Sequence, residues 1–149
     1  MLKKQLLVGV ALSVLNAGLA GGCAGDKELS KDEYVSRLNA MCEDFSAREQ
    51  EIGEPHTLAD LVEKGPQILG AFEMAIMEKV GALNAPDEIA AQADRLVDVA
   101  ETQGDVLGEL VAAARDDNFA EVRSLAERND ALNNESNAIA RELGADACD

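Results

Sequence analysis

The chain has 149 residues, of which 29 are acidic and 13 basic, so its formal net charge at neutral pH is −16. A chain this acidic, without a basic patch, is not expected to bind nucleic acid or an anionic lipid surface through its own side chains. The length suits one compact domain with its own core. The charge is explained by solubility, or by attraction of a cationic partner or divalent ion.

Residues 1–22 predict a secretory leader. Lys3 and Lys4 precede an apolar run, and small residues lead up to Cys23 in the stretch Leu19-Ala20-Gly21-Gly22-Cys23. This pattern resembles the bacterial lipoprotein signal, in which the cysteine after the cleavage site receives a diacylglycerol and an N-acyl group. The resemblance implies that the mature chain begins at Cys23 and is anchored by lipid, with residues 23–29 as a tether.

Two other interpretations of this leader remain open. Its apolar run has about ten residues, whereas a membrane-spanning helix needs about 20, so an uncleaved transmembrane anchor fits less well. Ordinary cleavage after Ala20 would release a soluble protein and leave Cys23 as a spare thiol. The lipidated form fits best, and it places the protein on the outer side of the cytoplasmic membrane or in the cell envelope.

Two cysteines remain once Cys23 carries lipid, namely Cys42 and Cys148. Because an exported protein meets an oxidising compartment, we expect them to form a disulfide. Such a bridge closes a loop of about 100 residues and would stabilise the fold by about 4 kcal/mol through lost loop entropy.

Apolar residues at helical spacing begin after the tether. Ser30 and Glu33 form a capping box that opens a first helix, over residues 30–52. A second stripe covers residues 57–83, with Thr57 as the cap of its helix. Pro66 lies inside it without changing its phase, which predicts one helix kinked at the proline.

Two further helices complete the pattern. Pro86 suits the first position of a third helix, over residues 86–114. Asn118 caps a fourth, which ends at Gly144, a residue type that favours the left-handed turn after a helix. Because the links between the four helices are short, chain neighbours must be antiparallel.

The sequence therefore predicts an all-α fold, an up-down-up-down antiparallel four-helix bundle over residues 30–149. Leucine and alanine dominate its seams. Gly104 and Gly108 lie beside the seam of the third helix, where they allow a neighbouring helix to approach closely.

A polar layer is predicted halfway along this bundle. At about 1.5 Å per residue, Asn39, Gln103, Asn129 and Asn133 all fall about 20 Å from the ends where the helices turn. Such a layer fixes the register of the helices by hydrogen bonds, lies at the edge of the seam in water, or lines a pocket for a small polar ligand. An enclosed polar pocket reached by Asn39, Gln103 and Asn129 would favour the ligand, whereas a filled core with Asn129 at the surface would count against it.

The same count creates a difficulty for the disulfide. It places Cys42 about 15 Å from the turn end and the end of the fourth helix about 38 Å from it. The tail over residues 143–148 spans at most about 17 Å. Either the fourth helix ends early or the helices are offset.

No residue set forms a catalytic or metal signature. His56 is the only histidine and lies in an expected turn, so neither a histidine-based triad nor a histidine-rich zinc site can form. Acidic residues follow one face of the third helix at three-four spacing, and we interpret them as a solvated face rather than a cation site. They are Asp94, Asp98, Glu101, Asp105 and Glu109. We expect no metal and no cofactor besides the covalent lipid.

Three short motifs carry a family resemblance. They are Asn39-Ala40-Met41-Cys42, Asn84-Ala85-Pro86, and Leu143-Gly144 shortly before Cys148. With them the mature chain is similar to small exported helical proteins and lipoproteins of actinobacteria. The resemblance implies the bundle and the disulfide and supplies no function.

We therefore expect a lipid-anchored extracytoplasmic protein that is not an enzyme and that acts as a binding or structural module of the cell envelope. Its partners would be the membrane, through the lipid, and an unidentified envelope protein. The alternative is an exported protein that binds a small ligand or cation at the mid-bundle polar layer. An enzyme of a kind without a recognisable signature is the third possibility.

Overall fold

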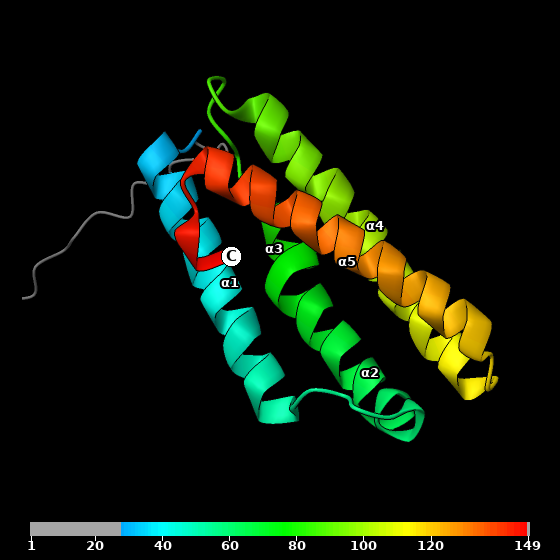
Figure 1. Ribbon diagram of the computed structural model, residues 1–149. Coiled ribbons are helices and arrows are strands. Elements are labelled where there is room, and N and C mark those ends of the chain that lie inside the picture. The colour runs from blue at the N-terminus through cyan, green and yellow to red at the C-terminus, as the bar shows by residue number, and fades with distance from the viewer. Residues whose placement is uncertain (1–27, 149) are drawn as a thin grey trace, which may run out of the picture.

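The computed structural model of the protein describes residues 28–148, and this part of the chain is all-helical (Figure 1). The leader, the lipidation site Cys23 and most of the tether lie outside the described residues. The helices are α1 (Lys31–Ile52), α2 (Leu58–Phe72), α3 (Glu78–Val80), α4 (Ala90–Arg115) and α5 (Phe119–Leu143). A π-helical turn, η1 (Glu73–Met77), joins α2 to α3, and a 3-10 turn, η2 (Asp146–Cys148), follows α5.

Side-chain caps begin three of these helices, as predicted. The Ser30 hydroxyl accepts from the backbone N–H of Glu33, and the Glu33 carboxylate accepts from that of Ser30. Thr57 and Asp60 form a second capping box, at the start of α2. The Asn118 side chain accepts from the N–H at the third position of α5. Each cap satisfies backbone donors that a helix N-terminus otherwise leaves open.

The second helical stretch is continuous through Pro66, as predicted, and it contains one irregularity that the sequence did not predict. Pro66 lies inside α2, and the departure from α-helical bonding comes two turns later, at η1. There Met77 lies against α4 at Gly104, where an added Cβ would come within 2.6 Å of the Met77 sulfur. Gly104 thus allows the close approach of a neighbouring helix that its position predicted. The α-helical geometry of the second stretch ends at Val80 rather than at Leu83.

The predicted start of the third helix at Pro86 is wrong. Residues 86–89 form a turn closed by a hydrogen bond of 3.0 Å from the Ile89 N–H to the Pro86 carbonyl, and α4 begins at Ala90. Ile89 has φ −125° and ψ 6°, outside the helical region. The turn takes up the residues that would otherwise form the first helical turn.

The core divides into two hydrophobic clusters. The first cluster draws on α1, α3, α4, α5 and the tail, and its largest fully buried members are Tyr34, Leu38, Val80, Ile139 and Leu143. The second cluster lies farther along the α4–α5 pair and consists of Val106, Leu110, Ala113 and Leu125. Among the described residues, α1 contributes only to the first.

The tail after α5 folds back along α1, in red against cyan in Figure 1. Gly144 has φ 90° and turns the chain, and η2 then lies on α1. The predicted disulfide is present, with a Cys42–Cys148 S–S distance of 2.01 Å and a Cα–Cα distance of 5.1 Å. We call residues 144–148 the C-terminal strap.

The strap brings Cys148 to Cys42, although the sequence-based count made the tail too short for this and although the fourth helix does not end early. α5 continues to Leu143, and this residue packs in the first cluster with Tyr34 and Leu38 of α1. The fourth helix therefore does not end early, and its last residue lies in the same buried cluster as Tyr34 and Leu38. A count that assumes ideal helices aligned at a common level overestimates the distance between Cys42 and the end of the fourth helix.

Candidate functional site

The predicted polar layer does not converge on one point. Asn39 is half-buried, and its side-chain oxygen accepts a hydrogen bond of 3.0 Å from the backbone N–H of Ala147 in the strap. Asn129 is half-buried with its side-chain oxygen enclosed and without a partner among residues 28–148, and Asn133 is exposed. Of the four residues, Gln103 alone lines the pocket described next.

The site to which Gln103 belongs is a pocket of about 140 Å³ in the first cluster, reached by α1, α2, η1, α3, α4, α5 and the strap. Most of its lining is apolar, including Ile76 of η1, Leu96 and Ala100 of α4, and Ala140 of α5. The few polar groups are Ser46, Glu49, Gln103 and Ser136. A pocket with apolar walls and a small number of polar groups is the usual form of a small-molecule site.

Two aromatic rings form part of the wall. Phe45 of α1 and Phe72 of α2 meet edge to face, with ring centroids 5.5 Å apart and an angle of 76° between the planes. This is a preferred geometry for aromatic pairs, since the positive edge of one ring faces the negative face of the other. The pair therefore stabilises the contact of α1 with α2 while presenting an apolar surface to the pocket.

The C-terminal strap closes another side of the pocket. Ala147 and Cys148 line it, and the Cys42–Cys148 bridge together with the Asn39–Ala147 hydrogen bond holds them in place. With its amide nitrogen toward the strap, Asn137 also donates to the Cys148 carbonyl, at 2.8 Å. The cysteines predicted the bridge, but nothing in the sequence indicated that the bridged tail would form a wall of a pocket.

Glu49 is the charged residue of the pocket lining. Although part of this side chain is open to solvent, burial of its carboxyl group raises its pKa. No ion pair joins it to a basic residue within the described range. Sequence reasoning missed Glu49 because one glutamate among 29 acidic residues carries no signal until the fold sets it beside a pocket.

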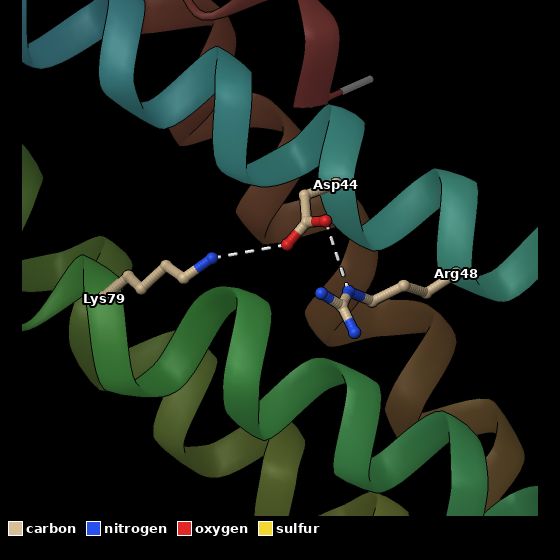
Figure 2. Close-up of polar contacts among 3 residues, drawn as sticks. All are labelled: Asp44, Arg48 and Lys79. Carbon is tan, nitrogen blue, oxygen red and sulfur yellow. Dashed lines mark hydrogen bonds and ion pairs between the residues drawn. The ribbon is translucent and has the colours of Figure 1, made fainter.

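A second acidic residue of α1 has the opposite surroundings. Asp44 accepts from Arg48 Nε at 3.2 Å and from Lys79 Nζ of α3 at 3.3 Å (Figure 2). The hydrogen bonds from Arg48 and then from Lys79 hold the pKa of the Asp44 carboxyl below its usual value. Arg48, one residue before Glu49, is thus bound to Asp44. The ion pair of Lys79 with Asp44 ties α1 to α3.

The phenol of Tyr34 is fully enclosed in the first cluster, and its hydroxyl has no partner among the described residues. Burial raises the pKa of this phenol, and the negative charge of Asp94 adds to the effect. Tyr34 does not line the pocket, so we assign it to the core.

The acidic face of α4 is exposed at all five predicted positions. Glu109 forms an ion pair with Arg128 of α5 at 3.8 Å. In the described part of the chain, His, Cys, Asp and Glu side chains do not gather in groups of three that could hold a metal ion. Nor does any helix there combine the length and the apolar character needed to cross a membrane.

The fold and the pocket together define an all-helical domain, closed by a disulfide, with an apolar site under its C-terminal strap. Comparisons of the chain with protein-family models, curated proteins and solved structures find no match. The function must therefore be argued from the site itself.

Proposed function

We propose that the protein is a non-enzymatic, lipid-anchored binding module of the cell envelope that holds a small, mostly apolar ligand in the pocket under its C-terminal strap. One observation carries this proposal, the pocket of about 140 Å³ within the first cluster. A pocket with apolar walls and a small number of polar groups has the form of a small-molecule site.

The extracytoplasmic location rests on two features. The stretch from Leu19 to Cys23 has the pattern of a lipoprotein signal, with Cys23 as the acylated residue. The Cys42–Cys148 disulfide supports the same location, because disulfides persist in oxidising compartments outside the cytoplasm. A diacylglycerol on Cys23 would then anchor the domain through the short tether of residues 23–29.

The size of the pocket limits the ligand. An engineered cavity of about 150 Å³ in another protein binds benzene, whereas pockets for drug-sized molecules measure about 300–1,000 Å³. A pocket of about 140 Å³ therefore suits one ring or a short branched chain. Since Asn39 is engaged by the strap and Asn133 is exposed, a ligand with an apolar body is better supported than a ligand held by the polar layer predicted from the sequence.

We also propose that the helical runs form the up-down-up-down antiparallel bundle predicted from the sequence. The short links over residues 53–57 and 116–118 support this topology, because helices joined by so few residues lie antiparallel to each other.

Intact mass spectrometry tests the location. The protein purified from membranes of its native host should begin at Cys23 and carry acyl mass, and Cys42 and Cys148 should be alkylated only after reduction. A Cys23→Ala variant should lose the acyl mass and leave the membrane fraction. An unlipidated wild-type chain with free thiols would contradict the proposal.

Binding of benzyl alcohol tests the pocket. The full chain in lipid nanodiscs, labelled with ring-¹³C phenylalanine, carries three reporters: Phe45 and Phe72 in the pocket wall and Phe119, which is 69% exposed. We expect the signals of Phe45 and Phe72 to shift in a saturable way while that of Phe119 stays in place. An Ala100→Leu variant that keeps its helical circular dichroism should lose the response, since its larger side chain fills the pocket. Equal shifts at all three rings, or none, would contradict the proposal.

A further inference from the structure

Glu49 lies where the pocket meets a second hollow. Glu49 and Ser46 line the pocket and also a more open hollow beside it, which is bounded by the end of α1, the turn at Gly53 and Pro55, and Ile68 of α2. Residues shared by an inner and an outer hollow lie at the opening between them. A molecule in the pocket would therefore have its apolar part inside and its outer end beside the Glu49 carboxylate.

Two basic side chains, those of Arg48 and Lys64, lie near this opening, but neither lines the pocket or the outer hollow. Arg48 Nε donates to Asp44, and Lys64 Nζ donates to the backbone carbonyl of Glu54 at 3.1 Å. The acidic Glu54 itself borders the outer hollow. The charged side chains that line the pocket and the outer hollow are thus Glu49 and Glu54, both negative in their ionised forms.

We infer that the pocket takes a small organic ammonium ion, with its apolar body against Phe45 and Phe72 and its charged group at the Glu49 carboxylate. This inference rests on the proposed function and adds the ligand class. Ser46 at the opening and Gln103 deeper in the lining offer further hydrogen-bond partners.

The surroundings of Glu49 favour a cationic partner. Burial raises the pKa of this carboxyl because it disfavours the ionised form. An ammonium ion beside the carboxylate removes that penalty, because an opposite charge within about 4–6 Å favours the ionised form. Residues that cost stability in the unliganded protein are often those that serve binding.

A matched set of ligands tests the inference with the same labelled full chain in nanodiscs. Benzylammonium, benzyl alcohol and benzoate share one ring and differ in charge, and equilibrium dialysis gives the free concentration of each. At neutral pH we expect benzylammonium to bind about three- to tenfold more tightly than benzyl alcohol, the range for a partly exposed charge-assisted hydrogen bond. Benzoate should bind more weakly than either.

Two variants identify the charge responsible. Glu49→Gln should lower the affinity for benzylammonium to about that for benzyl alcohol, because the amide keeps the size of the side chain and removes its charge. Glu51→Gln removes the same charge from the same helix at a residue that lines a different hollow, with Pro66 and Met74, and should keep the preference for benzylammonium.

The possible results separate the two proposals. Equal binding of benzylammonium and benzyl alcohol, or a preference that survives in Glu49→Gln, overturns the ammonium inference and leaves the pocket as a ligand site. If none of the three ligands moves the signals of Phe45 and Phe72, the proposed binding function fails, and the inference fails with it.

Discussion

The two hydrophobic clusters of this protein are closed in different ways. The first is held by contacts between residues far apart in sequence, including the Cys42–Cys148 bridge and the Asn39–Ala147 hydrogen bond. The second depends on the α4–α5 pair and on the close approach of α2, where Gly65 lies against Val111. The pocket lies in the first cluster alone. The covalent tie and the pocket thus lie at the same end of the domain, while α2 and α4 pack closely at the other end.

Removal of the disulfide should have the largest effect on this difference. Replacing Cys42 and Cys148 by alanine should lower the free energy of unfolding by about 4–5 kcal/mol, in line with the loop-entropy value for a sequence separation of 106 residues. Denaturant titration followed by circular dichroism measures the loss. Hydrogen exchange should rise first at the strap amides, since they lose the tie to α1.

Reductant supplies the control for this experiment. It should destabilise the wild-type protein to the same extent and leave the double variant unchanged. A double variant as stable as the oxidised wild-type protein would show that the first cluster does not depend on the bridge.

Truncation of one core side chain in each cluster should come next. Ile139 is 0% exposed in the first cluster, and Leu125 is 5% exposed in the second. Ile139→Ala should lower the free energy of unfolding by about 3–4 kcal/mol and Leu125→Ala by about 2–3 kcal/mol, because a less enclosed site relaxes more easily around a cavity. Thermal and denaturant unfolding of both variants check the order. A larger loss at Leu125 would place the main stabilising core at the tip of the α4–α5 pair.

Two glycines of α2 offer a matched pair of substitutions with opposite expected effects on the free energy of unfolding. A Cβ on Gly65 would come within 2.6 Å of a methyl group of Val111, whereas one on Gly70 meets no atom within 4 Å. Gly65→Ala should therefore lower stability by about 1–3 kcal/mol, because the stiff valine cannot move aside without cost. Gly70→Ala should raise stability by about 0.5–1 kcal/mol through helix propensity. If both variants gained stability, the close contact of α2 with α4 would not exist in solution.

The smallest expected effect concerns Glu49. Its raised pKa means that its contribution to stability is fully present below the pKa of unfolded glutamate, about 4.3, and is lost as pH rises through the higher folded pKa. Glu49→Gln should thus match wild type near pH 3 and exceed it at pH 7 by no more than about 0.5 kcal/mol, the usual range for partly exposed positions. Unfolding measured at both pH values tests the sign of this stability difference. Glu51→Gln is the control for the loss of one negative charge.

Local rules predicted much of the chain because they depend on neighbours in sequence. The caps at Ser30, Thr57 and Asn118 and the left-handed turn at Gly144 follow from hydrogen bonds and backbone freedom within one helical turn. The predicted start at Pro86 failed because a proline suits a tight turn as well as a first helical turn. The π-helical turn at η1 has no signal in the spacing of apolar residues, and the structure offers no local cause for it.

The sequence by itself determined the all-helical class, the extents of most helices and the pairing of Cys42 with Cys148. These features depend on periodicity, on end signals and on the small number of cysteines. Only the tertiary structure decided that the strap closes a pocket, that Gln103 lines it without Asn39, Asn129 or Asn133, and that Glu49 stands at its opening. The reason is geometric, because counting residues along a helix gives the height of a side chain on the helix axis but not the direction in which it points. The pocket, moreover, exists only where segments distant in sequence meet.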